Sequence, residues 1–192
     1  MLLVNWVMLF SLYDLATIVC YFTNWALLLT TVWVVLSILC ARDTQVYQNR
    51  PGLLALHHIF FEVAVIFNLV IMVVYWPMLH ESVVTYCYQK GEMMKLYHNH
   101  FVHTFPFITI ALNFLFSDVI ISASHTKALL PIAITYGYKN YQATIQMGEP
   151  VYWFLDWKDH WTLIIFGGIT AGAMLVFYLL SWMTYSLKRV NL

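Results

Sequence analysis

The chain has 192 residues, of which 62% are hydrophobic and only 9% are charged, and its nine basic residues balance nine acidic residues. Soluble domains carry charge on roughly 25% of their residues, so this composition excludes an ordinary soluble domain and indicates an integral membrane protein. A neutral chain without a basic stripe offers no surface to a polyanion, and we therefore expect no nucleic-acid partner.

Residues 1–20 form the first predicted element, a short N-terminal apolar helix. They are apolar except for Asn5 and Asp14, and they contain neither Gly nor Pro. This segment could be a first membrane span, an interfacial helix or an extension of the next helix. The choice decides whether the bundle has five or six spans.

The other predicted helices are stretches of about 20 mostly apolar residues, the length that a membrane span requires. They cover residues 22–41, 55–79, 101–122, 128–147 and 162–185. The stretch 128–147 is the poorest, because Lys139, Asn140 and Gln142 must face protein or an aqueous cavity. The sequence shows no linker between these predicted helices and no internal repeat. We therefore predict one all-α domain over residues 1–192, a polytopic transmembrane helical bundle of five to six helices, multi-pass in an endomembrane or an organelle inner membrane.

Polar side chains form a stripe on two of these helices. At about 100° per residue, the stripe on 22–41 contains Thr23, Thr30 and Ser37. The polar face of 101–122 contains His103, Pro106, Thr109, Asn113 and Ser117. Polar faces of membrane helices turn toward protein rather than lipid. We therefore expect the two stripes to face each other. Because two crossings separate the helices, both enter the membrane from the same side, and we expect Thr23 and His103 at similar depth.

A hydroxyl beside an imidazole is the minimum for nucleophilic catalysis, because the imidazole can take the hydroxyl proton and later return it to the leaving group. Thr23 and His103 are the candidates for such a pair. A structural interpretation stays open, in which the Thr hydroxyl bonds a carbonyl one turn back in its own helix and His103 only joins helices.

The segment 99–106 reads Asn-His-Phe-Val-His-Thr-Phe-Pro. It resembles the signature of the androgen-induced membrane hydrolase family, to which the rolling stone proteins are also similar. Three further segments agree: Tyr-Phe-Thr-Asn-Trp at 21–25, Tyr-Trp at 75–76, and Val-Tyr-Trp-Phe-Leu at 151–155, where the family has Val-Tyr-Pro-Phe-Leu. In order and spacing, the resemblance extends over residues 20–185.

Members of this family are six-helix proteins that hydrolyse fatty acid esters of hydroxy fatty acids. The resemblance implies that Thr23 is the nucleophile and His103 the base. Such a substrate would enter sideways from the membrane lipids. Asn99, His100 and Asn113 are the candidates for donating a hydrogen bond to the oxyanion or for supporting the pair.

Two differences from the family favour a second function. Only 22 residues precede Thr23, so we expect the family's first helix and the following loop to be truncated or absent, and Trp153 stands where the family has Pro. The alternative is a non-catalytic accessory transmembrane subunit of a larger membrane complex. Such a subunit would retain the hydrolase-like fold and contact partner transmembrane subunits.

Eight histidines invite a metal or haem interpretation. Zinc needs three or four convergent ligands, no two histidines lie four residues apart, and bis-His haem needs facing histidines on neighbouring helices. We therefore expect no metal and no cofactor. We interpret His58 and Glu62, which are four residues apart, as a hydrogen-bonded pair inside the membrane. A transporter is disfavoured, because the chain shows neither repeats nor interrupted helices.

Three tryptophans precede the last predicted span. Trp153, Trp157 and Trp161 are spaced by four residues, which places them on one face if the segment is helical. Because Trp side chains gather at the level of the lipid headgroups, we expect a membrane anchor here.

Overall fold

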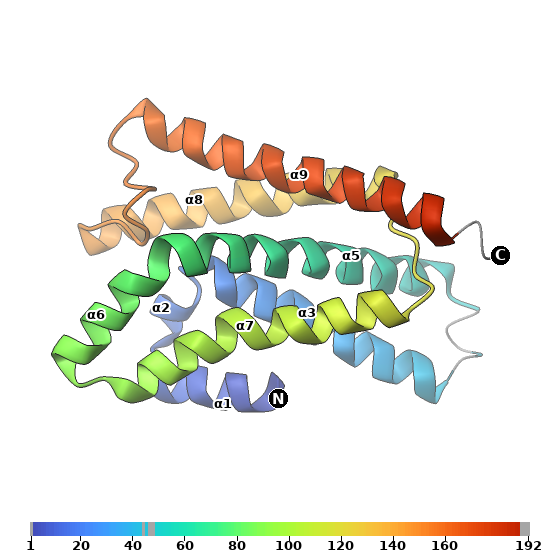
Figure 1. The fold of residues 1–192 in the computed structure, drawn as a ribbon, viewed down its shortest axis with the longest axis horizontal. Coiled ribbons are helices and arrows are strands. Elements are labelled where there is room, and N and C mark those ends of the chain that lie inside the picture. Colours follow the sequence, from blue (N-terminus) through green and yellow to red (C-terminus); the bar gives the residue numbers. More distant parts are fainter. Residues whose placement is uncertain (1, 44, 46–48, 189–192) are drawn as a thin grey trace. The chain divides into compact units, whose positions relative to one another are not determined.

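The computed structural model describes residues 2–43, 45 and 49–188, and every regular element in these ranges is a helix (Figure 1). The all-α prediction is therefore confirmed. Internal contacts group the chain into two compact units. The first contains the residues up to Ile18 and Thr23–Ser117, and the second contains Val19–Phe22 and the residues from Asp118 onward. The expectation of a single transmembrane domain stays a prediction.

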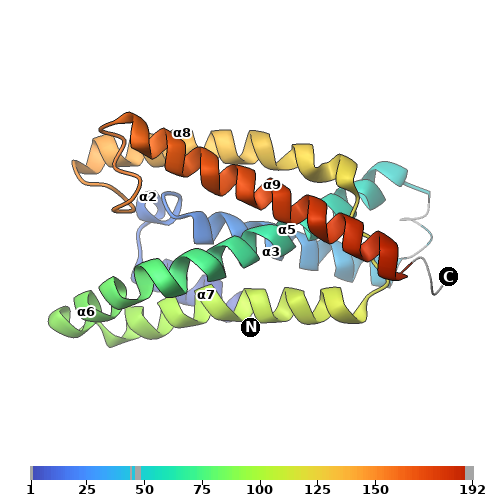
Figure 2. The ribbon, with the colours of Figure 1, turned by 45° about the horizontal axis from the view of Figure 1, so that its top comes forward.

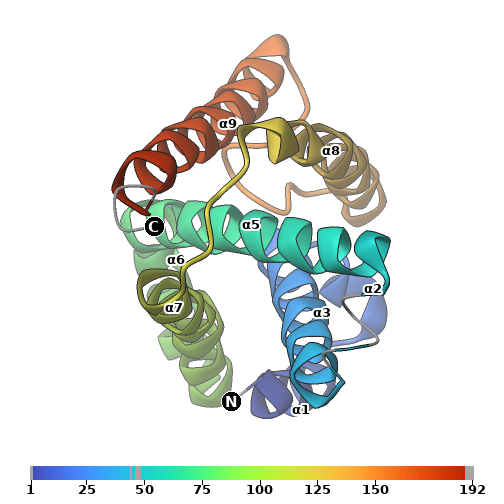
Figure 3. The same ribbon diagram turned by 90° about the vertical axis from the view of Figure 1, so that its right-hand side faces the viewer.

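The first unit contains the helices that carry the predicted polar stripes. Its elements are α1 (Leu2–Leu12), α2 (Leu15–Ile18), all of α3 (Phe22–Arg42) except its first residue, α5 (Pro51–Val74), the π-helical turn η1 (Tyr75–Leu79), α6 (His80–Lys90) and α7 (Met93–Phe116). Helix α7 packs against α5 and against α1. Seen along the long axis, α3 and α7 lie below α5, and α1 lies on the side away from α5 (Figure 3).

Proline and glycine residues explain where these helices begin, bend and end. Pro51 lies at the start of α5, where its fixed φ suits the first turn of a helix. Pro77 lies within η1, and because it has no N–H it cannot continue the regular hydrogen-bond pattern of α5. Gly91 ends α6 with φ 67°, a left-handed conformation that Gly adopts easily at a helix C-terminus. The chain then reverses into α7 (Figure 1).

The predicted helix over residues 1–20 is wrong as one continuous element. Helix α1 ends at Leu12, and Asp14 then accepts hydrogen bonds from the backbone N–H and the hydroxyl of Thr17, at 2.9 and 2.7 Å. The 11 residues of α1 extend for about 16 Å, against a hydrocarbon core of about 30 Å. Helix α1 is therefore neither a span nor an extension of α3. It packs into the first unit through a cluster of Leu9, Ile18, Leu27 and Val102.

Three helical segments among the described residues are long and apolar enough to cross a membrane. They are Phe22–Arg42, Pro51–Lys90 and His160–Leu187, and they contain the predicted spans 22–41, 55–79 and 162–185. The predicted span 101–122 is wrong at its C-terminal end, because α7 stops at Phe116 and Ser117 is extended. Ser and Asp side chains compete with helical hydrogen bonds, and Ser117-Asp118 supplies both.

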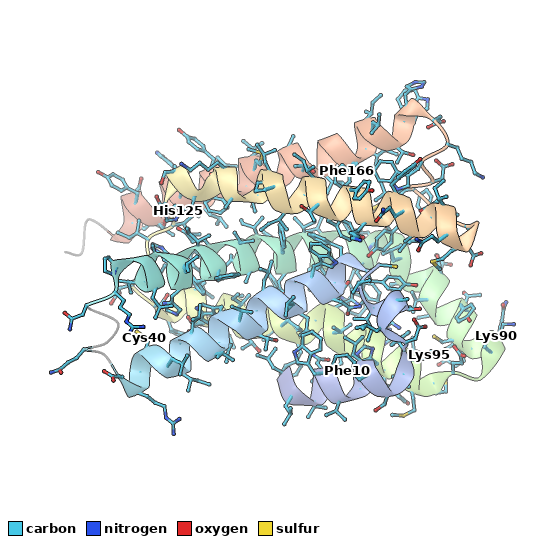
Figure 4. All side chains as sticks on the ribbon, turned by 180° about the vertical axis from the view of Figure 1, so that it is seen from behind. Phe10, Cys40, Lys90, Lys95, His125 and Phe166 are labelled. Carbon is cyan, nitrogen blue, oxygen red and sulfur yellow. The ribbon has the colours of Figure 1, made fainter. Side chains whose placement is uncertain are left out.

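The second unit contains η2 (Ala123–Ala128), α8 (Leu129–Met147) and α9 (His160–Lys188). The predicted helix 128–147 therefore agrees closely with α8. Helices α8 and α9 lie side by side (Figure 2). Gly137 permits this approach, because a Cβ at this position would lie 2.8 Å from Cζ of Phe166, which extends from α9 toward α8 (Figure 4).

Candidate functional site

The first unit brings Thr23 and His103 together. Thr23 is the second residue of α3, and His103 lies in the first half of α7. The Thr23 Oγ1 and His103 Nε2 atoms are 2.9 Å apart, and both side chains are buried. The predicted proximity of these two residues, which are 80 positions apart in the sequence, is therefore observed.

A second hydrogen bond sets the tautomer of His103. Its Nδ1 lies 2.6 Å from the backbone carbonyl oxygen of Asn99, one helical turn earlier. A carbonyl oxygen only accepts, so Nδ1 must carry the proton of the neutral imidazole. Nε2 is then the acceptor, and the Thr23 hydroxyl donates its proton to it. This direction is the one in which an imidazole acts as a general base toward a hydroxyl.

Tyr75 covers one face of the His103 ring. The two ring centroids are 3.7 Å apart and the planes differ by only 12°. Tyr75 is the first residue of η1, and π-helical turns inside longer helices occur frequently at functional sites. In the sequence, Tyr75 was visible only as part of the Tyr-Trp motif, and its place at the site was not predicted. The signal available was an aromatic residue two positions before Pro77, where a regular helix must be disturbed.

Asn99 supports the pair from α7. Its side-chain Nδ2 donates to the backbone oxygen of Lys95 at 2.8 Å and, more weakly, to the Tyr13 hydroxyl at 3.4 Å. The Nζ atom of Lys95 in turn bonds Glu92 at 2.8 Å. The side-chain amide of Asn99 is thus already hydrogen-bonded. Asn99 contributes its backbone carbonyl to the site, and this carbonyl orients His103.

His100 and Asn113 lie elsewhere on α7. The His100 ring stacks on Trp76 and His80, with centroids 5.6 and 5.1 Å away. Asn113 is exposed and follows His103 by ten residues, or about 15 Å along the helix. The proposal of Asn113 as an oxyanion donor is therefore wrong, because the helical rise carries it away from the pair.

The two predicted stripes meet only at Thr23 and His103. Thr30 accepts a hydrogen bond from Asn68 of α5 at 2.9 Å, and Ser37 lies 2.8 Å from His57 of α5. On α7, Thr109 is exposed and donates to a carbonyl of its own helix. The stripes therefore face each other at Thr23 and His103, as expected, but the stripe on α3 turns toward α5 after its first residue.

The predicted pair of His58 and Glu62 is confirmed. His58 Nε2 lies 3.2 Å from Glu62 Oε1, one helical turn apart on α5, and the Glu62 side chain is fully buried. Spacing of four residues within one helix was sufficient to predict this contact.

His98, His100 and His103 follow closely on α7, but their contacts do not converge as metal ligands would. Both ring nitrogens of His103 are occupied, one by Thr23 and the other by the Asn99 carbonyl. A metal needs a free nitrogen lone pair, so His103 cannot ligate in this arrangement. The expectation of no metal and no cofactor stays a prediction.

The segment 148–159 of the second unit, which includes Val151-Tyr152-Trp153-Phe154-Leu155, is not helical. Its tryptophans therefore do not share one helical face, and that prediction is wrong. Trp157 has φ 59° and donates from Nε1 to the Asn140 side chain at 2.7 Å, whereas Trp153 is exposed. The Tyr152 hydroxyl accepts from the backbone N–H of Phe22 at 3.1 Å, and desolvation raises the pKa of Tyr152 to about 12.

No protein-family model matches the chain, and the comparisons with curated proteins and with solved structures found no match. The resemblance to the androgen-induced membrane hydrolases therefore rests on the sequence motifs, and membership of that family stays a prediction.

Proposed function

We propose that this chain is a multi-pass membrane hydrolase of lipid esters, with Thr23 as nucleophile and His103 as general base. The observation that carries the proposal is the 2.9 Å contact from the Thr23 hydroxyl to His103 Nε2. The Asn99 carbonyl, by holding the proton on Nδ1, keeps Nε2 free to accept. A base that is oriented by a third group is the recurring arrangement of nucleophilic hydrolases.

The reaction proceeds in two steps. Thr23 Oγ1 attacks the acyl carbonyl carbon while its proton moves to His103 Nε2. The bond between the acyl carbon and the alkoxy oxygen then breaks, and His103 returns the proton to the leaving alcohol. In the second step, water attacks the acyl carbon of the acyl–Thr23 ester while one of its protons moves to His103 Nε2. The bond between the acyl carbon and Thr23 Oγ1 then breaks, His103 returns the proton to Oγ1, and the fatty acid leaves.

Lipid esters are the substrate class that this environment favours. Thr23 lies one residue into Phe22–Arg42, a helix long and apolar enough to cross a membrane. An ester group at the head of a hydrocarbon chain is expected at such a depth, and its acyl chains would be covered by apolar side chains or lipid. The motif resemblance narrows the proposed substrate to fatty acid esters of hydroxy fatty acids.

The test is hydrolysis of a fatty acid ester of a hydroxystearic acid by the purified protein in lipid nanodiscs. Thr23→Ala and His103→Ala are each expected to lower the rate by at least about 10³-fold. Ser37→Ala, which removes another hydroxyl beside an imidazole, is expected to retain activity. A folded wild-type protein that hydrolyses none of a panel of lipid esters contradicts the proposal, and so does an active Thr23→Ala variant.

An accessory transmembrane subunit remains the second candidate, because α9 presents small residues on an open face. Among the described residues, nothing lies within 4 Å of a Cβ placed at Gly168 or Gly172. These two glycines are four residues apart, a spacing that allows close approach of another helix. Site-specific cross-linking in native membranes tests this candidate. It is supported if Gly172→Cys captures one defined partner and the purified wild-type protein is inert toward lipid esters.

A further inference from the structure

Tyr75 is buried at the candidate site with an unsatisfied hydroxyl. Its side chain is 1% exposed, and its ring stacks on His103. No hydrogen-bond partner for its Oη is present among the described residues. Most buried hydroxyls in proteins have a partner, and each exception calls for a specific explanation.

Packing alone does not explain why this residue is Tyr rather than Phe. The stack on the imidazole uses the ring, which Phe shares, whereas the unpaired hydroxyl is destabilising where it is buried. The hydroxyl is therefore retained at a cost to the folded protein. An acceptor that is present only during function, such as an oxygen of the substrate, would satisfy it.

Other unsatisfied polar atoms belong to residues near His103 in the sequence of α7. His100 Nε2 and Thr104 Oγ1 are also buried without a hydrogen-bond partner among the residues the structure describes, and they flank His103 in the sequence of α7. The His100 ring is linked to Tyr75 through Trp76, because it stacks on the Trp76 ring and the Trp76 ring meets the Tyr75 ring edge to face. Unpaired polar atoms on α7 thus occur within three residues of His103.

We infer that the Tyr75 hydroxyl donates a hydrogen bond to the acyl carbonyl oxygen of the ester and stabilises the oxyanion that forms when Thr23 attacks. This inference rests on the proposed hydrolase function and adds a catalytic residue to it. The phenol is preorganised by its stack on His103, and a fixed donor in a dry site stabilises developing charge without reorganisation.

Tyr75 is better suited to this role than the three residues that the sequence suggested. The Asn99 amide already donates to the Lys95 carbonyl, and Asn113 is exposed and distant from the pair. His100 does not stack directly on His103, whereas the ring centroids of Tyr75 and His103 are 3.7 Å apart. Tyr75 is the donor that combines full burial, an unpaired hydroxyl and direct contact with the base.

The experiment compares Tyr75→Phe with a matched control, Tyr136→Phe, in nanodiscs. Tyr136 is also buried, but its hydroxyl is satisfied: it donates to the Cys20 carbonyl at 3.2 Å and accepts from Asn140 at 3.3 Å. We measure ester hydrolysis, the rate of covalent labelling of Thr23 by a lipophilic fluorophosphonate, and the melting temperature. The phosphoryl oxygen of this probe takes the place of the oxyanion.

Tyr75→Phe is expected to lower both the hydrolysis rate and the labelling rate by about 10²-fold or more, with a melting temperature equal to or above that of the wild type. Tyr136→Phe is expected to do the reverse, lowering the melting temperature and leaving the labelling rate of the folded fraction unchanged. A substitution that stabilises the protein and impairs both rates has removed a functional group rather than a packing contact.

Three results overturn the inference, and they separate it from the proposed function. If Tyr75→Phe retains wild-type rates while Thr23→Ala and His103→Ala are inactive, Tyr75 is not the donor and the hydrolase proposal stands. If Tyr75→Phe loses activity in proportion to a fall in melting temperature, or does not fold, its role is packing. If the folded wild-type protein neither hydrolyses esters nor reacts with the probe, both proposals fail.

Discussion

The two ends of α3 each place a hydroxyl beside an imidazole, but the protons point in opposite directions. At one end, the Asn99 carbonyl holds the proton on Nδ1 of His103, so Thr23 donates to Nε2. At the other end, Ser37 donates its only proton to the backbone oxygen of Trp33 at 2.9 Å.

Nε2 of His57, which lies 2.8 Å from Ser37 Oγ, must therefore donate to the Ser37 oxygen rather than accept from it. A hydroxyl beside an imidazole is consequently not enough for a nucleophile and base. A competing acceptor decides where the hydroxyl proton points. Ser37 donates to a carbonyl of its own helix, as Ser and Thr in membrane helices commonly do. Thr23 lies in the first turn of α3, and the hydrogen bond its side chain makes in the structure is the one to His103.

The strongest test of this comparison is selective covalent labelling. A lipophilic fluorophosphonate should modify Thr23 at least about 10²-fold faster than Ser37, because only Thr23 has a base positioned to take its proton. Serine is intrinsically the less hindered alcohol, so preference for a threonine is informative. Peptide mass spectrometry identifies the modified residue, and His103→Ala should abolish the labelling of Thr23. Equal labelling of the two residues would remove the distinction between the pairs.

A variant in the second unit, which contains neither pair, separates stability from chemistry. Gly137→Ala places a Cβ 2.8 Å from Cζ of Phe166 and is expected to destabilise the protein by about 1–3 kcal/mol through overpacking. The hydrolysis rate per folded molecule should stay unchanged. Thermal unfolding measures the loss, and Phe166→Leu combined with Gly137→Ala should recover part of it. An unchanged melting temperature would contradict the close approach of α8 and α9.

Asn68 of α5 contacts Thr30, which lies between Thr23 and Ser37 in the sequence of α3. It is buried and donates to Thr30 of α3 at 2.9 Å and to the Ala64 carbonyl at 2.8 Å. Asn68→Ala should lower the free energy of unfolding by about 1 kcal/mol with little effect on hydrolysis. A double-mutant cycle with Thr30→Val in mixed micelles measures the coupling. Loss of hydrolysis at full stability would place the active pair elsewhere on α3.

The smallest expected effect is a pH dependence at Asp156 in the segment 148–159. The backbone N–H of Lys158 and the hydroxyl of Thr162 donate to this carboxylate, and they lower its pKa below the usual 3.8. A carboxylate whose pKa is lower in the folded state than in the unfolded state stabilises the folded protein at pH values above the unfolded-state pKa. This contribution is lost as the pH falls through the folded-state pKa. Asp156→Ala should lower the melting temperature at pH 7 and differ progressively less from the wild type toward pH 3. A difference that does not shrink would argue against this carboxylate's role.

Sequence alone determined the features that depend on local composition and helical spacing. Apolar stretches of sufficient length predicted α3, the helix from Pro51, α8 and α9, because a segment in a bilayer must satisfy its own backbone hydrogen bonds. The spacing of four residues predicted the contact of His58 with Glu62, because both ends lie on the same helix. The polar positions Thr23 and His103 were also visible as the first residues of two stripes.

Tertiary structure decided which polar groups meet and in which direction their protons point. Helical periodicity places Thr23, Thr30 and Ser37 on one face, but it does not say that α5 rather than α7 covers the last two. Nor does it place Tyr75 on the ring of His103, since that contact joins η1 to α7 and depends on the π-helical turn. Spacing along one helix follows from a fixed rise and rotation per residue, whereas contacts between helices depend on the packing of residues far apart in the chain. For this reason the candidate pair was readable from the sequence, and the donor and acceptor roles within it were not.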